Sequence, residues 1–238
     1  MVRRVSLLKQ NTENVSCMIS DAQLFDRHGN RKYLNTSERL RFYRAARRTR
    51  CLVERVFLLT LYYTGCRISE AIALTPDNFD FAGRMIVFQT LKQRSKRRFR
   101  ALTIPGQLAG LLRVLIELHG RTAKDRLFPF SRITGWRHVK DCMVGADLHG
   151  PQATPRGLRH GYAIAAVSRE VPLPTVQKWL GHTSLKTTGI YLNFVGEEER
   201  KLASRTWPRL WSRIAWPLCI LRYSERIKLA WTMRSALT

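Results

Sequence analysis

Tyr191 ends the segment Leu180–Tyr191, whose residue types could carry nucleophilic chemistry. A tyrosine hydroxyl is a poor nucleophile at neutral pH, because the phenol keeps its proton until about pH 10. It becomes useful only where fixed positive charges surround it and a phosphate lies nearby. His182 precedes Tyr191 by nine residues, and two arginine-containing segments, Thr64–Glu70 and Leu158–His160, lie further upstream. These residues could together attack a phosphodiester.

Arg67 and Arg159 are the candidates to bind the attacked phosphate. The transition state spreads negative charge over the phosphoryl oxygens, and guanidinium groups are planar, permanently charged and bidentate. Lys92 could protonate the departing 5′ oxygen if neighbouring cations lower its pKa. His182 would serve as a neutral donor beside the phosphate. A covalent link to Tyr191 would keep the energy of the broken bond, so we expect no ATP, no metal ion and no other cofactor.

The composition favours a polyanionic partner. The 238 residues include 42 Lys plus Arg against 17 Asp plus Glu, a formal net charge of +25. Such an excess repels itself unless a polyanion neutralises it. Nucleic acid is the leading partner, with an anionic membrane surface as the alternative. At 45% hydrophobic residues the chain can bury a core, which argues against wholesale disorder.

The cysteines and the apolar segments bear on where the protein works. The five cysteines are odd in number and include no Cys-x-x-Cys pair, so neither a disulfide framework nor a zinc site is indicated. Free thiols suit a reducing cytoplasm. The N-terminus lacks an apolar signal core, and no run of eighteen apolar residues occurs. We therefore expect a soluble, cytoplasmic protein.

The sequence pattern predicts a mainly α fold with one small antiparallel β-sheet (α+β). Asn35–Glu38 has the form of a capping box and begins a basic helix that ends near Arg48. Cys51–Tyr63 is apolar enough for a buried helix, which Gly65 stops. The other expected helices are Ile68–Leu74, Gln107–Leu118, Leu158–Ser168, Leu173–Leu180, Ser184–Tyr191 and one that begins at Glu197.

Two strands, Met85–Phe88 and Ala101–Pro105, should flank a basic hairpin tip. Residues 92–100 of this tip contain no acidic residue. Most of its basic side chains are expected to contact DNA phosphates from a solvated loop. These predicted DNA contacts are Arg94, Lys96, Arg97, Arg98 and Arg100.

We expect three parts along the chain: a short N-terminal segment at residues 1–32, one domain at 33–204, and a basic, Trp-rich tail at 205–238. The tail has no clear heptad or strand period. It could be an arm for DNA, a membrane-surface helix, or a non-native extension from a disrupted reading frame. We favour the first and the last of these over the membrane helix.

These motifs resemble those of the tyrosine recombinases, the phage-integrase family. Thr64–Glu70 is similar to the first arginine box of the family, Leu158–His160 to the second, and Leu180–His182 to the third. Tyr191 falls at the position of the nucleophile, and Lys92 lies on the hairpin where the family carries its lysine. The resemblance covers roughly residues 33–200. A single box is weak, but all of them in order at compatible spacing form a strong signal.

The resemblance implies that residues 33–204 form a catalytic domain of the tyrosine-recombinase and type IB topoisomerase fold. It implies a site-specific DNA recombinase of the integrase or invertase type, acting on double-stranded DNA with inverted-repeat sites in the bacterial cytoplasm, at the nucleoid. Four protomers would exchange strands through 3′-phosphotyrosyl intermediates and a Holliday junction. The implied catalytic residues are Arg67, Lys92, Arg156, Arg159, His182 and Tyr191, with Glu70 and His160 supporting them.

Arg156 departs from the family pattern. The second box usually reads His-x-x-Arg, and its histidine is often assigned as the base that takes the tyrosine proton. Arginine stays protonated and is an implausible base. Type IB topoisomerases place a lysine there, so Arg156 would act as a third phosphate contact that lowers the pKa of the tyrosine. The proton would leave to water or to a neighbour such as His160, although we favour a core role for His160.

The region before Tyr33 is a second departure, because it is too short for the separate helical domain with which most members clamp DNA. The layout resembles the short invertases or a truncated integrase. Two other functions therefore stay open. One is a topoisomerase-like activity that nicks and relaxes DNA, which Arg156 suggests. The other is a DNA-binding regulator that has lost catalysis.

Overall fold

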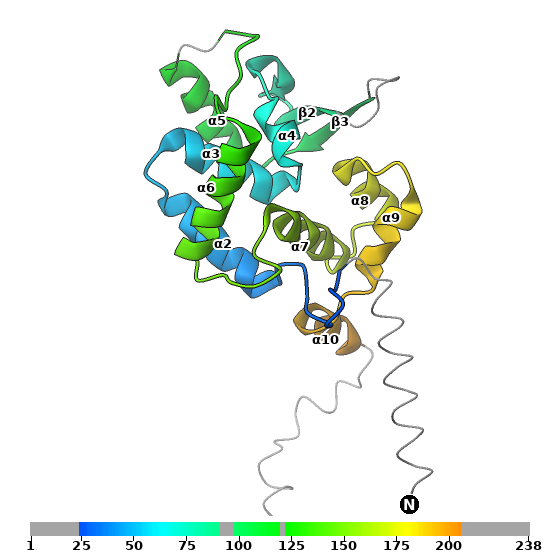
Figure 1. The fold of residues 1–238 in the computed structure, drawn as a ribbon. Helices are drawn as coiled ribbons and strands as arrows, with labels where there is room; N and C mark the ends of the chain where they lie inside the picture. The colour runs from blue at the N-terminus through cyan, green and yellow to red at the C-terminus, as the bar shows by residue number, and fades with distance from the viewer. Residues whose placement is uncertain (1–23, 91–97, 120–121, 206–238) are drawn as a thin grey trace, which may run out of the picture. The chain divides into compact units, whose positions relative to one another are not determined.

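The structure is a computed structural model that describes residues 24–90, 98–119 and 122–205, with only the backbone at Thr90, Arg98, Glu197 and Lys201. Its described elements confirm the predicted fold class, mainly helical with a small antiparallel sheet (Figure 1). The helices are α2 (Thr36–Arg48), α3 (Leu52–Thr64), α4 (Ile68–Ile72), α5 (Gly106–Leu118), α6 (Arg132–Gly145), α7 (Pro155–Val167), α8 (Leu173–Leu180), α9 (Leu185–Gly189) and α10 (Glu197–Ala203). The strands are β1 (Phe79–Asp80), β2 (Met85–Thr90) and β3 (Arg98–Thr103), and η1 (Pro76–Asn78) and η2 (Ile190–Leu192) are short 3-10 helices.

Helices α2 and α3 follow the sequence signals closely. The predicted capping box begins α2: Glu38 N donates to Asn35 Oδ1 at 2.8 Å, and Asn35 N donates to Glu38 Oε2 at 2.8 Å. The apolar residues of α3 are buried on most sides of the helix, as expected. Gly65 ends α3 with φ 59°, in the left-handed region that favours glycine.

The sheet has the order β1–β2–β3, and both pairings are antiparallel. Ile86, Phe88 and Leu102 point to the core, which explains the alternation of apolar residues along β2 and β3. We predicted the second strand from Ala101, but β3 begins at Arg98 and pairs Arg100 with Phe88. The prediction that Arg98 and Arg100 belong to the hairpin tip is therefore wrong.

Helix α7 lies in space between two groups of helices (Figure 1). Helices α8 and α9 are on one side of it, and α2, α3 and α6 are on the other. Its predicted start at Leu158 is too late. Thr154 caps the helix by accepting from Gly157 N at 3.0 Å, and Pro155 takes the first position, where a missing N–H costs nothing. As a result, Arg156, Arg159 and His160 all belong to the first turns of α7.

Other elements differ from the prediction. The expected helix Ser184–Tyr191 is split into α9 and η2. Helix α6 was not predicted, because its apolar positions are few and Gly135 interrupts them. Gly135 is needed for close packing, since a Cβ there would lie 3.1 Å from Phe57 Cζ and 3.3 Å from Ile68 Cγ2.

The chain divides into two compact units, and the first ends at Glu199, inside α10. All the described site residues lie in the first unit. No helix within the described residues is long and apolar enough to cross a membrane.

Candidate active site

Arg67 lies where the chain leaves α3 and enters α4. It is the N-cap of α4, and its backbone N–H donates to Glu70 Oε2 at 2.8 Å. Its Nη1 donates to Oε1 of the same carboxylate at 2.8 Å. The Arg67 side chain is 29% exposed, so it can still meet a ligand. Glu70 thus contacts Arg67 through both backbone and side chain, in line with the expected supporting position.

Glu70 is shared with a second arginine, Arg100. Arg100 Nη2 donates to Glu70 Oε2 at 2.7 Å and Nη1 to Oε1 at 3.3 Å. Arg100 Nε also donates to the Trp179 carbonyl at 2.9 Å, next to the third box. Burial raises the pKa of the Glu70 carboxyl, but the hydrogen bonds and charge of Arg100 outweigh it and hold that pKa below its ordinary value. Glu70 is therefore an ionised, paired carboxylate beneath Arg67.

This position corrects the prediction for Arg100. We expected it to contact DNA from a solvated loop, but it is 6% exposed and its guanidinium is occupied by Glu70 and Trp179. The error came from reading a run of basic residues as one surface. Along a strand, alternate side chains face opposite sides, so one member of such a run can point inward.

Arg159 connects the first and third boxes through α7. Its Nη1 donates to the Gly65 carbonyl at 2.7 Å, and its Nη2 donates to the Leu180 carbonyl at 2.7 Å and lies 3.2 Å from His182 Nε2. Burial lowers the pKa of Arg159 to about 10, with a further contribution from the charge of Arg67. The group remains a cation at neutral pH, so a buried positive charge sits at the centre of the site.

His182 follows Gly181, which ends α8 with φ 66°. Both of its ring nitrogens have partners, Arg159 at Nε2 and Thr188 Oγ1 at Nδ1, the latter at 3.0 Å. Because arginine can only donate, Nε2 accepts and Nδ1 carries the hydrogen. Burial and the charge of Arg159 lower the pKa of His182 to about 4, so the ring is neutral at pH 7.

Tyr191 lies in η2 and is 1% exposed. Its ring is stacked on His182, with centroids 6.1 Å apart and an angle of 16° between the planes. Its hydroxyl lies 3.0 Å from His160 Nδ1. Burial raises the pKa of Tyr191 above its ordinary value, although the charges of Arg159, Arg156 and Arg67 act in the opposite direction. The phenol is therefore protonated at neutral pH in this state.

His160 is the contact that sequence reasoning undervalued. It is buried, as we favoured, yet it points at Tyr191 as well. Its other nitrogen, Nε2, accepts from Arg156 Nε at 3.2 Å. The spacing of four residues from Arg156 places the two side chains on one helix face once α7 begins at Pro155. The spacing of four residues could have predicted that Arg156 and His160 lie side by side. Because we predicted that the helix begins at Leu158, Arg156 fell outside it.

The structure brings together five of the six residues expected to be catalytic: Arg67, Arg156, Arg159, His182 and Tyr191. The sixth, Lys92, lies outside the described residues, as do Arg94, Lys96 and Arg97. Arg98 is described only by its backbone, in β3. Thr188, which binds His182, was not predicted, because nothing in the sequence distinguishes it from the neighbouring threonines.

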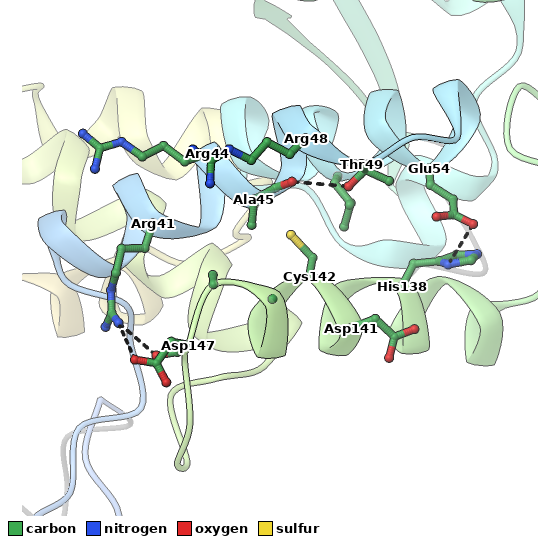
Figure 2. A pocket seen from close by; sticks show the side chains of 13 residues that line it. Arg41, Arg44, Ala45, Arg48, Thr49, Glu54, His138, Asp141, Cys142 and Asp147 are labelled. Atoms are coloured by element: carbon green, nitrogen blue, oxygen red, sulfur yellow. Dashed lines mark hydrogen bonds and ion pairs between the residues drawn. The ribbon is translucent and has the colours of Figure 1, made fainter.

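A groove of about 560 Å³ lies elsewhere, lined mainly by α2 and α6 (Figure 2). Its charged side chains are partly paired: Arg41 Nη1 lies 3.4 Å from Asp147 Oδ2, and His138 Nδ1 lies 3.5 Å from Glu54 Oε1. None of the residues around Tyr191 lines it. We therefore assign this groove no part in the chemistry of the site.

The arrangement of elements is that of tyrosine-recombinase catalytic domains. The crystal structure of XerA recombinase matches with a TM-score of 0.64 and 25% identity, covering 74% of this chain and 65% of that chain. XerH recombinase bound to its palindromic difH substrate, a post-cleavage complex, matches with a TM-score of 0.63 and 20% identity over 84% of this chain and 65% of that chain. The catalytic domain of bacteriophage HP1 integrase gives a TM-score of 0.51 and 21% identity over 74% and 95%. These likenesses establish the fold.

The sequence comparison identifies the family. The sequence profile of the phage integrase family matches residues 32–197, and the chain belongs to this family. Tyrosine recombinase XerD of Haemophilus influenzae is 31% identical over 170 residues, 66% of this chain and 56% of that protein. A tyrosine recombinase of Thermosipho africanus is 30% identical over 156 residues, 62% of this chain and 52% of that protein. The chain thus spans about half the length of the curated relatives it matches.

Proposed function

We propose that this chain is a site-specific DNA recombinase of the integrase or invertase type, and that Tyr191 forms a covalent 3′-phosphotyrosyl intermediate. One observation carries the proposal. The Tyr191 hydroxyl, two neutral histidines and the cations Arg156 and Arg159 meet at one place, although they come from three separate segments: α7, the residues that follow α8, and η2. Membership of the phage integrase family supports the same assignment.

The proposed step is a transesterification. The Tyr191 oxygen bonds to phosphorus, the bond from phosphorus to the 5′ oxygen breaks, and the phenol proton passes to water. The ammonium group of Lys92 donates a proton to the departing 5′ oxygen, while Arg67 and Arg159 contact the non-bridging oxygens. His182 packs against the ring of Tyr191 beside the phosphate. The covalent bond keeps the energy of the cleaved linkage, so no ATP or metal ion enters the step.

Tyr191 has to become accessible before this step. At 1% exposure in the chain alone, its oxygen cannot meet a phosphate. We propose that DNA binding shifts α9 and η2 enough to expose the phenol oxygen to the phosphate, while the Tyr191 hydroxyl stays within hydrogen-bond reach of His160. The short length of α9 and η2, three to five residues each, makes a local shift inexpensive compared with moving a long helix.

The proposed substrate is double-stranded DNA with inverted-repeat sites, bound by four copies of this chain in the bacterial cytoplasm. The net charge of +25 supports a polyanionic partner. XerH has been seen with palindromic difH, and the relatives named above are bacterial. We propose residues 33–204 as the catalytic domain, with Arg94, Lys96 and Arg97 as phosphate contacts.

The presence of Arg156 suggests a second candidate activity. A cation at this position is compatible with topoisomerase-like nicking and relaxation without strand exchange. A third outcome is a DNA-binding protein that no longer cleaves. The three differ in what they do to a supercoiled plasmid that carries two candidate sites.

The test uses nicked suicide duplexes and such plasmids, with sites taken from inverted repeats in the DNA that flanks the gene. A covalent adduct together with recombined plasmid supports the proposal. An adduct with relaxation alone indicates the topoisomerase-like activity, and specific binding without an adduct contradicts catalysis. Tyr191→Phe is the control, since it keeps the buried ring and removes only the hydroxyl.

A further inference from the structure

The hydrogen bond between Arg156 and His160 determines which nitrogen of the imidazole carries the hydrogen. Arg156 Nε has a hydrogen and no lone pair to offer, so it can only donate to His160 Nε2, 3.2 Å away. An imidazole nitrogen that accepts is unprotonated. The hydrogen of the neutral ring must then lie on Nδ1, the nitrogen 3.0 Å from the Tyr191 oxygen. The ring therefore presents a donor to the phenol.

From this geometry, and resting on the proposed function above, we infer that His160 is a positioning donor to the Tyr191 oxygen and not the base that accepts its proton, and that Arg156 holds it in that role. A donor of this kind stabilises the phenolate as it forms, because a hydrogen bond to a charged oxygen is about twice as strong as one to a neutral oxygen. It also aims the oxygen. The missing histidine of the second box is thus replaced by a pair that works differently.

The surroundings of His160 favour the neutral ring. The charged or titratable groups that act on it are Arg156 and Arg159 from its own helix, His182 from beyond α8, and Lys32 from the segment before α2, in addition to Tyr191 itself. Burial, with the charge of Arg156 as the next contribution, lowers the pKa of His160 to about 3. A ring that resists protonation so strongly is a poor proton acceptor and a good fixed donor.

Arg156 can link this donor to the substrate. Its side chain is exposed, and only its Nε is engaged by His160 among the described contacts. The terminal nitrogens of the same guanidinium can therefore contact a DNA phosphate while Nε keeps its bond. Phosphate binding and the orientation of Tyr191 would then depend on one side chain.

The direct test is the tautomer of His160 in the DNA-free protein, read from long-range proton–nitrogen NMR correlations of labelled histidine at pH 7.5. With six histidines in the chain, the His160 signals are assigned by their loss in His160→Asn. The inference predicts a protonated Nδ1 and an unprotonated Nε2. Arg156→Met should move population to the Nε2-protonated form, while Arg137→Met, an exposed arginine of α6, should not. A hydrogen on Nε2 in the unmodified protein, or no change in Arg156→Met, overturns the inference.

A matched pair of variants tests the catalytic consequence. Asparagine can donate to the phenol oxygen and cannot act as a base, whereas leucine has the same shape and can do neither. We expect adduct formation on a suicide duplex to be about ten- to a hundredfold slower in His160→Leu than in His160→Asn. The difference in rate between His160→Leu and His160→Asn should become smaller as the pH approaches the range in which the phenol ionises by itself. A packing defect would give a difference that does not depend on pH in this way. Equal impairment of both variants overturns the inference.

The two proposals fail separately. If the unmodified protein forms no adduct on any site, the proposed function is wrong, and the NMR measurement alone decides the role of His160. If it forms the adduct while His160 carries its hydrogen on Nε2, the proposed function stands and this inference is wrong.

Discussion

Arg100 and Arg159 hold the site together by donating to backbone carbonyls as well as to side chains. Arg159 binds the carbonyls of Gly65 and Leu180, and Arg100 binds that of Trp179. These bonds connect the first box to the third across a gap of more than a hundred residues of sequence. A carbonyl acceptor carries no net charge, so Arg159 keeps its positive charge available to an incoming phosphate, whereas the charge of Arg100 is paired with Glu70.

Removal of Arg100 should be costly, because it leaves the buried Glu70 carboxylate with one cation in place of two. We expect Arg100→Met to lower the free energy of unfolding by about 3–5 kcal/mol, measured by urea denaturation. Arg137→Met, on an exposed face of α6, should change it by about 0.5 kcal/mol or less. Adding Glu70→Gln to Arg100→Met should restore part of the loss. Equal effects of the two arginine substitutions would contradict the assigned pairing.

The neutral state of His160 predicts how stability depends on pH. Its pKa is about 3 in the folded protein and about 6.5 in the unfolded chain, so the unfolded chain binds more protons between these values. Stability is then full above about pH 6.5 and falls as the pH decreases, by up to about 1.4 kcal/mol per pH unit from this group. Urea titrations between pH 7 and 5 should show a shallower slope in His160→Asn than in His119→Asn, whose histidine is exposed. Identical slopes would contradict the buried neutral ring.

At the scale of elements, the turn between α3 and α4 places Arg67, and it depends on Gly65. A Cβ at this position would lie 2.5 Å from Tyr162 Cδ1 on α7, and the backbone φ of 59° adds strain. We expect Gly65→Ala to destabilise the fold by about 2–4 kcal/mol and to slow adduct formation by displacing Arg67.

The control for this prediction is the same substitution in α5. Gly110 lies inside that helix with open space where a Cβ would be. Gly110→Ala should stabilise the protein by about 0.5–1 kcal/mol, because alanine loses less backbone entropy in a helix. Thermal unfolding of both variants should therefore give shifts of opposite sign, and shifts of the same sign would contradict the close approach at Gly65.

Local signals were sufficient for elements whose ends are marked by capping residues. The capping box at Asn35 and the stop at Gly65 both give the observed boundaries. Local signals failed where tertiary packing decides: α6 continues through Gly135, where the absence of a Cβ leaves room for Phe57, and this contact leaves no trace in the pattern of α6 itself. The inward turn of Arg100 likewise depends on Glu70, thirty residues away.

In the candidate site, too, some features could be predicted from local signals and others depend on tertiary structure. The motifs were sufficient to select Arg67, Arg159, His182 and Tyr191, which the structure places around one another. They were insufficient for the bond between His160 and Tyr191, since it needs both the register of α7 and the change from α-helix to 3-10 helix between α9 and η2. Periodicity alone does not predict where a helix tightens in this way.

At the scale of the whole molecule, the charge excess predicts strongly salt-dependent DNA binding. Each phosphate neutralised by Lys or Arg releases counterions, so the logarithm of the binding constant should fall linearly with the logarithm of salt concentration. Six to ten phosphate contacts would lower affinity by about 10³ to 10⁵ between 50 and 200 mM salt. Fluorescence anisotropy with a labelled duplex measures this slope. Tyr191→Phe should leave the slope unchanged, and a flat salt response would contradict a phosphate-dominated interface.

The central claim is that Tyr191 is the residue that becomes bonded to DNA. The most direct measurement is mass spectrometry of the protease-digested adduct formed on a nicked suicide duplex. The account predicts one cross-linked peptide that contains Tyr191, with a 3′-phosphate on the phenol oxygen, and none from Tyr191→Phe. An adduct that persists in Tyr191→Phe, or that maps to another residue of the unmodified chain, would contradict it.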